Sequence, residues 1–428
     1  MNQLPLRPNE TRDALIYLLH STDAYICTAP PYSSRHIHTK RQIIVFFTCL
    51  QELGAFLSSV SFFLSLGVVV VATRRQAMSS LQRYLPWLIF FLLHGGREAA
   101  AGKVPAIIVF GDSSVDTGNN NFIPTIARSN FWPYGRDYAN GLPTGRFSNG
   151  RLATDFISEA FGLPPSIPAY LDTNCSIDQL ATGVSFASAA TGLDNATAGV
   201  LSVITLDEQL AYFKEYTDRL KVAKGDAAAK EIISEALYIW SIGTNDFIEN
   251  YYNLPERRMQ YTVGEYEAYL LGLAEAAIRR VHAVGGRKMD FTGLTPMGCL
   301  PAERIGNRGD PGECNEQYNA VARTFNAKLQ DLVAKLNKDL RGLRLVFADT
   351  YQLLATVVSK PADYGFDNAV QGCCGTGLFE AGYFCSFSTS MLCGNANKYV
   401  FFDAIHPTEK MYKLLADTVI NTTLHVFL

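Results

Sequence analysis

From residue 104 onwards, the sequence alternates short, continuously apolar runs with longer stretches of helical periodicity. Apolar side chains recur every three or four positions in 270–281 and 318–336, and Gly285 and Gly286 end the first of these helices. The short apolar runs predict buried strands at 106–110, 236–242, 288–294 and 343–348. Strands that alternate with helices predict an α/β domain whose parallel sheet is covered on both faces.

The composition is that of a folded chain with a sizeable core. Hydrophobic residues make up 48% of the 428 positions and charged residues 18%, which argues against disorder. The 37 lysines and arginines nearly balance the 40 aspartates and glutamates, and no basic stripe stands out. We therefore expect no nucleic-acid partner. No internal repeat or low-complexity linker interrupts the body of the chain, which favours a single domain at 102–428.

The N-terminal part contains two apolar segments in tandem. Residues 53–73 carry no charge and are long enough to span a bilayer. Residues 78–101 form a complete secretory signal peptide, which opens at Met78 and has Arg83, an apolar run at 85–93 and three alanines at its end. Either 53–73 anchors the protein in a membrane, or translation starts at Met78 and 1–77 is an extension that the working protein lacks. We favour the second reading because the signal is complete by itself.

The cysteines predict disulfides and therefore an oxidising compartment. Of the nine in the chain, Cys27 and Cys49 lie in the N-terminal part. The body contains Cys175, Cys299, Cys314, Cys373, Cys374, Cys385 and Cys393, which leaves one unpaired whatever the pairing. A zinc site is the competing reading, but no cysteine pair has metal-finger spacing with histidines nearby.

Glycosylation sequons are also consistent with export. They lie at Asn174, Asn195 and Asn421, and at Asn9 if residues 1–77 are present and face the lumen.

One histidine has a partner that would make it a catalytic base. After residue 101 the chain has only His282, His406 and His425. His282 lies on a predicted helix just before its glycine stop, and His425 is almost at the end of the chain. His406 follows Asp403 by three residues, close enough for a carboxylate to hold one ring nitrogen and leave the other free. The sequence therefore predicts His406 as the base and Asp403 as the acid that orients it.

A base of this kind activates a hydroxyl nucleophile, and the oxyanion that forms needs fixed hydrogen-bond donors. Ser113 and Asn245 each follow a predicted strand, so a parallel sheet would bring them to one edge. The backbone amide of Ser113, the amide of Gly150 and the side chain of Asn245 are the candidate donors. Each signal alone is weak, because such residues are usually turn or cap residues. The Gly-x-Ser-x-Gly motif of a lipase-type nucleophile elbow does not occur around Ser113.

Longer blocks carry a resemblance to a known family. They are Gly111-Asp112-Ser113, Gly145-Arg146-Phe147-Ser148-Asn149-Gly150-Arg151, Phe186-Ala187-Ser188-Ala189-Ala190-Thr191-Gly192, Gly243-Thr244-Asn245-Asp246, Gly298-Cys299-Leu300-Pro301, Cys373-Cys374-Gly375-Thr376-Gly377 and Asp403-Ala404-Ile405-His406-Pro407. In these blocks the chain resembles the plant branch of the GDSL esterase/lipase family, within the SGNH hydrolases, from about residue 104 to the C-terminus. Ser114, Ala190 and Ser185 depart from the family's usual Leu, Gly and Cys.

The resemblance implies a three-layer α/β/α, flavodoxin-like SGNH-hydrolase fold with a central parallel sheet of about five strands. It implies Ser113 as nucleophile, Asp403 and His406 as the rest of the triad, and Ser113, Gly150 and Asn245 as oxyanion donors. It also implies ester hydrolysis without a metal or other cofactor, by a secreted or wall-associated protein.

The substrate is less defined by the sequence. A lipid ester and a cell-wall polysaccharide ester both fit, and transfer of the acyl group to an alcohol is an alternative to hydrolysis. A third alternative is a non-catalytic wall-binding protein of the same fold, although no catalytic position is replaced. The apolar stretch 122–134 is open to two readings, as an acyl-binding groove or as plain core.

Overall fold

The computed structural model describes residues 104–306, 312–387 and 391–428. The predictions on the extension 1–77, the apolar segment 53–73, the signal 78–101 and the sequon at Asn9 lie outside these residues. Within them, no helix combines the length and the apolar character that a bilayer-spanning segment needs.

A five-stranded parallel sheet forms the centre of the fold, as predicted. Its spatial order is β2-β1-β3-β4-β5. The strands are β1 (Ile107–Gly111), β2 (Gly183–Ser185), β3 (Leu237–Ser241), β4 (Lys288–Thr292) and β5 (Arg344–Ala348). The four predicted runs correspond to β1, β3, β4 and β5. The edge strand β2 is only three residues long and contains one aliphatic side chain, which is why no apolar run predicted it.

Helices of very different length connect the strands. The longer ones are α4 (Ala153–Ala160), α7 (Leu206–Lys224), α8 (Asp226–Glu235), α10 (Val263–Val284), α12 (Glu316–Asp339), α13 (Tyr351–Ser359) and α15 (Glu409–Thr422). The shorter ones are α5 (Ile177–Leu180), α6 (Asn195–Leu201), α9 (Pro255–Gln260), α11 (Pro301–Ile305), α14 (Tyr383–Phe387) and the π-helix η4 (Asp246–Tyr251). The predicted helices at 270–281 and 318–336 are parts of α10 and α12, and α10 ends at Gly285 as expected.

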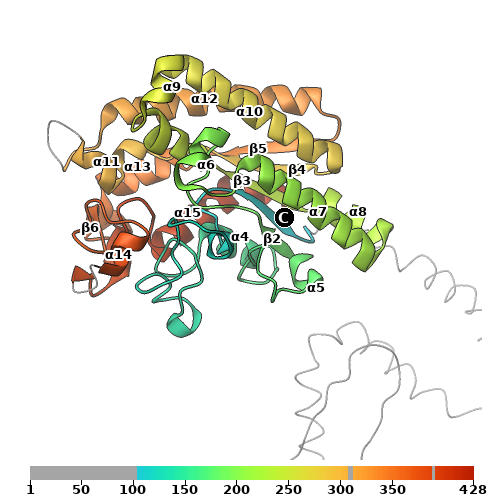
Figure 1. Cartoon of the computed structure of the whole chain (residues 1–428), viewed down its shortest axis with the longest axis horizontal. Helices are drawn as coiled ribbons and strands as arrows, with labels where there is room; N and C mark the ends of the chain where they lie inside the picture. The colour runs from blue at the N-terminus through green and yellow to red at the C-terminus, as the bar shows by residue number, and fades with distance from the viewer. Residues whose placement is uncertain (1–103, 307–311, 388–390) are drawn as a thin grey trace, which may run out of the picture. The chain divides into compact units, whose positions relative to one another are not determined.

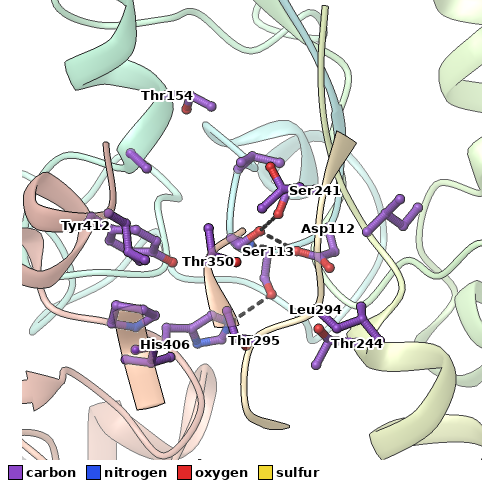
Figure 2. A pocket seen from close by; sticks show the side chains of 18 of the residues that line it. Asp112, Ser113, Thr154, Ser241, Thr244, Leu294, Thr295, Thr350, His406 and Tyr412 are labelled. Carbon is purple, nitrogen blue, oxygen red and sulfur yellow. Dashed lines mark hydrogen bonds between the residues drawn. The ribbon is translucent and has the colours of Figure 1, made fainter. Parts of the chain in front are cut away.

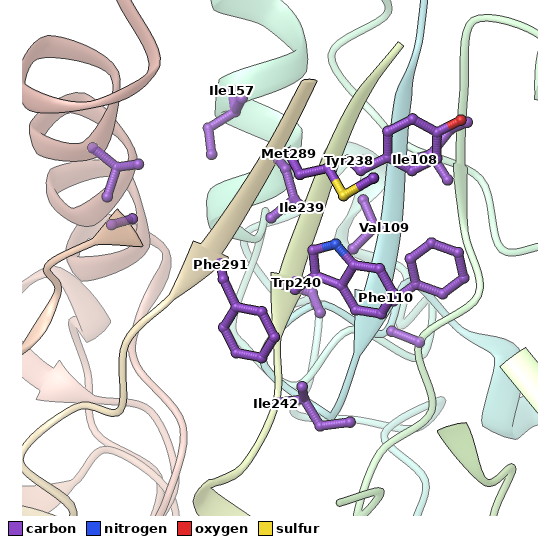
Figure 3. Close-up of a cluster of buried hydrophobic side chains, with 14 of the residues drawn as sticks. Ile108, Val109, Phe110, Ile157, Tyr238, Ile239, Trp240, Ile242, Met289 and Phe291 are labelled. Carbon is purple, nitrogen blue, oxygen red and sulfur yellow. The ribbon is translucent and has the colours of Figure 1, made fainter. Parts of the chain in front are cut away.

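The two faces of the sheet are covered by different helices, which confirms the three-layer α/β/α class. On one face α10 packs between α7 and α12 (Figure 1). Alternate side chains of the strands point to this layer, and the rings of Phe110, Trp240 and Phe291 lie side by side across β1, β3 and β4 (Figure 3). The ring of Phe213 on α7 packs edge-on against Phe110. On the opposite face, α15 packs against α4 and α13.

The strand order places the functional edge of the sheet. The chain leaves β1 to form β2 on one side and returns to form β3 on the other, so β1 and β3 flank the point where the winding direction changes. In open α/β sheets, ligands bind outside the carboxyl ends of the strands at this point. Ser113 follows β1 and Asn245 follows β3, so both lie at this edge.

A small two-stranded sheet carries the C-terminal loop that contains His406. It consists of β6 (Asn368–Gly372) and β7 (Tyr399–Phe401). Two disulfides, Cys373–Cys393 and Cys374–Cys385, bind the segments around it, and a third joins Cys299 to Cys314. The predicted disulfides are therefore present within the described residues, and Cys175 is the cysteine left over.

The three sequons within the described residues lie on the surface. Asn174, Asn195 and Asn421 are all exposed, as an acceptor of a glycan must be. Their modification stays a prediction.

Candidate active site

Ser113 is presented by a sharp turn at the end of β1. Gly111 has φ of 154°, and a Cβ on it would lie 2.1 Å from the carbonyl oxygen of Ser241 on β3, so only glycine fits here. The side-chain amide of Gln209 holds the turn by accepting from the Gly111 amide at 3.0 Å and donating to its carbonyl at 2.9 Å. The Asp112 amide donates to Ser241 at 3.0 Å. The turn is therefore fixed before any substrate binds.

Ser113, His406 and Asp403 form one chain of hydrogen bonds. The Oγ of Ser113 lies 2.7 Å from Nε2 of His406 (Figure 2). Nδ1 of the same ring lies 2.7 Å from Oδ2 of Asp403 and 2.9 Å from its Oδ1. Asp403 is fully buried, and His406 and Ser113 are 6% and 8% exposed. Ser113 and His406, which are 293 positions apart in sequence, thus meet at the carboxyl edge of the sheet.

The backbone around Asp403 fixes the orientation of its carboxylate. Oδ1 accepts hydrogen bonds from the amides of Ile405 at 2.8 Å and His406 at 2.6 Å. The Phe402 amide donates to the His406 carbonyl at 2.7 Å, which closes a tight loop directly after β7. On its other side, the imidazole packs against the ring of Phe147, with 4.8 Å between the ring centroids. Through Phe147, the Gly145–Arg151 block therefore lies beside the triad.

Tyr134 is a residue at the site that the sequence reasoning did not single out. Its hydroxyl donates to Oδ2 of Asp403 at 2.6 Å and accepts from the Gly382 amide at 2.7 Å. Burial and the charge of Asp403 raise the pKa of Tyr134 well above its ordinary value, so the hydroxyl keeps its proton as a donor. The Cys374–Cys385 disulfide closes the loop that contains Gly382. Nothing in the local pattern around residue 134 marks such a role, because its partner is 269 residues away.

The three candidate oxyanion donors have different surroundings. Ser113 and Asn245 line the same cavity, and one N–H of the Asn245 amide donates to the Thr191 carbonyl at 3.0 Å. Gly150 is buried next to Glu409, and a Cβ on Gly150 would lie 2.5 Å from the carboxyl carbon of that side chain. Close packing against Glu409 therefore accounts for glycine at this position. Gly150 is not among the residues that line the cavity.

The remaining histidines lie elsewhere. His282 is half-buried near the end of α10, and its Nε2 lies 3.1 Å from the Arg341 carbonyl. His425 is exposed in the last turn of the chain. Neither lines the cavity that contains Ser113.

The cavity at Ser113 continues inward between the sheet and the layer of α4, α13 and α15, with a volume of about 130 Å³. Its apolar walls come from Ile157, Ile239, Ile242, Leu294, Leu354, Leu415, Ala416 and Val419. No residue of the stretch 122–134 lines it, so this stretch is not the wall of this cavity. Within the described residues, no cluster of three or more histidine, cysteine or acidic side chains could hold a metal ion.

Two buried carboxylates in the motif blocks have structural contacts instead. Asp246 accepts from the amides of Leu193 and Asp194 and from the Thr197 hydroxyl, and burial raises its pKa to about 7. Asp116 accepts from the amides of Gly118, Asn119 and Ala189. These contacts tie the loops after β1, β2 and β3 to one another around the triad.

Comparison with known proteins agrees with this architecture. The family model of the GDSL-like lipase/acylhydrolases matches residues 107–419. Two Arabidopsis thaliana proteins, each named as a GDSL esterase/lipase, are 51% and 53% identical to the chain. The alignments cover 80% and 78% of this chain, and 97% and 95% of the relatives. The alignment with a solved lipase from a goat rumen metagenome covers 74% of this chain and 97% of that one, at 12% identity and a TM-score of 0.33. The chain belongs to the GDSL-like lipase/acylhydrolase family.

Proposed function

We propose that the protein hydrolyses carboxylic esters through an acyl intermediate on Ser113. Its membership of a family of esterases and lipases supports the ester hydrolase class. The observation that carries the mechanism is the continuous chain from Ser113 Oγ through the His406 ring to Asp403, with both links at 2.7 Å. A serine hydroxyl becomes a useful nucleophile when a base can take its proton in this way.

The steps follow from the hydrogen bonds. Nε2 of His406 takes the proton of Ser113 as Oγ bonds to the ester carbonyl carbon, whose oxygen becomes an oxyanion. The Ser113 amide, the second N–H of Asn245 and the Gly150 amide are the proposed donors to that oxyanion. The carbonyl re-forms, the ester C–O bond breaks, and His406 returns its proton to the leaving alcohol. A water molecule, deprotonated by His406, then attacks the acyl-serine carbonyl carbon. The bond from that carbon to Oγ breaks, the acid is released, and His406 returns the proton to Ser113.

Throughout these steps Asp403 keeps Nδ1 of His406 protonated and stabilises the imidazolium, while Tyr134 holds the carboxylate in place. Tyr134 thus acts through Asp403 and does not touch the substrate.

The proposed location is the cell exterior or the cell wall, with a lipid or a wall polysaccharide ester as substrate. Three disulfides in the described residues, the exposed sequons and the signal at 78–101 support export. If residues 53–73 are retained, they would instead anchor the domain to a membrane. The N-terminus of protein recovered from a secretory host separates the two: cleavage near residue 101 supports secretion, and a membrane fraction that keeps 53–73 supports the anchor.

A fluorophosphonate probe tests the mechanism directly, because it reacts with activated serines. Full-length protein from a secretory host should be labelled, Ser113→Ala should not be, and His406→Ala should be labelled far more slowly. His282→Ala is the matched control, since it removes a histidine that lies outside the cavity. Failure of a folded wild type to react would contradict the proposal and favour a non-catalytic role. Product analysis with an added alcohol would show whether the acyl group passes to water or to the alcohol.

A further inference from the structure

Three polar atoms on the walls of the inner cavity have no hydrogen-bond partner within the described structure. They are Oγ1 of Thr154, Oδ1 of Asp290 and the hydroxyl oxygen of Tyr412. All three residues line the cavity that contains Ser113, and their exposures are 1%, 1% and 3%. Burial of a polar group without a partner is unfavourable, so a partner is to be expected from outside the protein chain.

The three residues come from three different elements that enclose the same space. Thr154 lies in the first turn of α4, Asp290 in the middle of β4, and Tyr412 in the first turn of α15. Figure 2 places Thr154 and Tyr412 on the helical side of the cavity, across from Asp112 and Ser241 at the strand ends. Apolar side chains such as Ile157, Ile239 and Leu415 line the same cavity, so the three polar atoms face a largely apolar space.

Several other polar side chains of the cavity have partners within the protein. Ser114 bonds to Asp112 at 2.7 Å and to Ser241 at 2.8 Å. The Thr350 hydroxyl donates to the Gly293 carbonyl at 3.0 Å, so it too is satisfied within the protein. Even Asp290 accepts one bond, from Thr292 to its Oδ2 at 3.2 Å, and only its Oδ1 is left. Among the fully buried polar atoms of the described residues that line the cavity, those without a partner are thus the ones on Thr154, Asp290 and Tyr412.

The side chains of Thr154, Asp290 and Tyr412 suit a neutral ligand group that can both donate and accept a hydrogen bond. Threonine and tyrosine hydroxyls each donate and accept. Burial raises the pKa of Asp290 to about 7, so in mildly acidic surroundings the carboxyl is protonated and can donate as well. A hydroxyl is such a neutral group, whereas a charged group would lose its hydration in a largely apolar cavity.

We propose that Thr154, Asp290 and Tyr412 bind a hydroxyl carried by the acyl group of the substrate, and that the enzyme thereby selects esters of hydroxylated acids. The acyl group would extend from Ser113 along the apolar walls, with its hydroxyl among these three side chains. This inference rests on the proposed function, since it needs an ester that reacts at Ser113. A buried site that hydrogen-bonds a substrate hydroxyl discriminates strongly against the analogue without it, because its own polar groups are then left unpaired.

A matched series of esters tests the proposal. The probes are p-nitrophenyl octanoate and the octanoates that carry one hydroxyl at each successive carbon. For wild type, we expect one or two positions of the hydroxyl to raise kcat/KM about tenfold over plain octanoate, as for one hydrogen bond to a buried group. Tyr412→Phe, Thr154→Val and Asp290→Leu should each lower this ratio toward one. Ser129→Ala should leave it unchanged, because Ser129 is a buried hydroxyl that also lacks a partner but lies outside the cavity.

Two different failures can be told apart. If plain octanoate is cleaved at Ser113 but the ratio is one for every isomer, or is the same in all three variants, the inference is wrong and the polar atoms bind structural water only. If no ester is cleaved and the folded protein resists fluorophosphonate, the proposed function itself fails. Tyr412→Phe removes a single oxygen, so its ratio decides the matter even where Asp290→Leu does not fold.

Discussion

Two buried tyrosines near Asp403 have opposite surroundings. Burial and the charge of Asp403 raise the pKa of both Tyr134 and Tyr412 well above the ordinary tyrosine value. The Tyr134 hydroxyl has partners on two sides, Asp403 and Gly382, in a loop region closed by a disulfide. The Tyr412 hydroxyl has none within the described residues and lies on the wall of the cavity.

The difference separates two uses of a buried polar group. Where every partner is a protein atom, the group fixes geometry, and its loss should slow the reaction of every ester alike. Where the partner is missing, the group is available to a ligand, and its loss should change which ester reacts best. Mutations of the two tyrosines should therefore differ in kind as well as in size.

Asp403→Asn should have the largest effect. The amide can no longer hold Nδ1–H of His406 in the required tautomer, so we expect kcat for simple esters to fall by about 10⁴-fold. Steady-state kinetics and the rate of fluorophosphonate labelling both measure this loss. Asp367→Asn is the matched control, because Asp367 is exposed and pairs with Lys398 near the surface. A loss below tenfold in Asp403→Asn would show that His406 does not depend on this carboxylate.

Tyr134→Phe should have an intermediate effect on kcat. It removes one hydrogen bond to an ionised, buried carboxylate, which corresponds to about 1.5–3 kcal/mol, or roughly ten- to hundredfold in rate. Because Tyr134 does not line the cavity, KM should stay within about twofold. In Tyr412→Phe, by contrast, the preference among acyl groups should change.

The proposed difference between the two tyrosines is wrong if Tyr134→Phe and Tyr412→Phe change the kinetics in the same way. A rise in KM at constant kcat in Tyr134→Phe would place this tyrosine with the substrate and not with the triad. A uniform loss of kcat for all esters in Tyr412→Phe would give Tyr412 a positioning role too. Labelling by fluorophosphonate adds an independent measure, since the probe lacks a long acyl chain and reports on Ser113 alone.

The local pattern of the sequence accounts for much of the fold and of the triad. The predicted β1 and β3 runs are each followed by glycine, Gly111 and Gly243, and the Asp403–His406 spacing is short, so both signals lie within a few residues. Ala190 shows a finer case: the family usually has glycine there, and the structure gives this alanine a φ of 67°, where glycine is preferred. Here a departure from the family pattern coincides with a backbone constraint.

The contacts that the sequence did not reveal are long-range. Tyr134 meets Asp403, and Gly150 meets Glu409, only after the sheet and the C-terminal loop have assembled. The three side chains without a partner, Thr154, Asp290 and Tyr412, come from α4, β4 and α15. Asp290 lies inside the stretch 288–294, which was predicted as a buried strand from its apolar residues. Hydropathy averages over such a residue, although a lone acid in a buried strand is a signal that can be sought.

Asp290→Asn concerns stability and not reaction rate, through the pH dependence of the free energy of unfolding. Burial raises the pKa of Asp290 from 3.8 to about 7, so the folded protein binds a proton here that the unfolded chain has lost. The free energy of unfolding gained from this group is complete below about pH 4 and is lost as the pH rises through 7, by at most about 1.4 kcal/mol per pH unit. Urea unfolding between pH 4.5 and 7.5 should therefore give a shallower pH dependence for Asp290→Asn than for wild type.

The control for this last comparison is Asp367→Asn, whose stability should follow the wild-type curve because residue 367 is exposed. Parallel curves for wild type and Asp290→Asn would mean that the carboxyl is ionised in the folded protein over this range, with a partner for its charge. The hydroxyl-binding part of the cavity would then be anionic and would suit a different acyl group. The pH dependence of the free energy of unfolding, measured without any substrate, thus shows whether Asp290 is protonated in the folded protein. The hydrogen bonds that the inner cavity can offer a ligand depend on that protonation state.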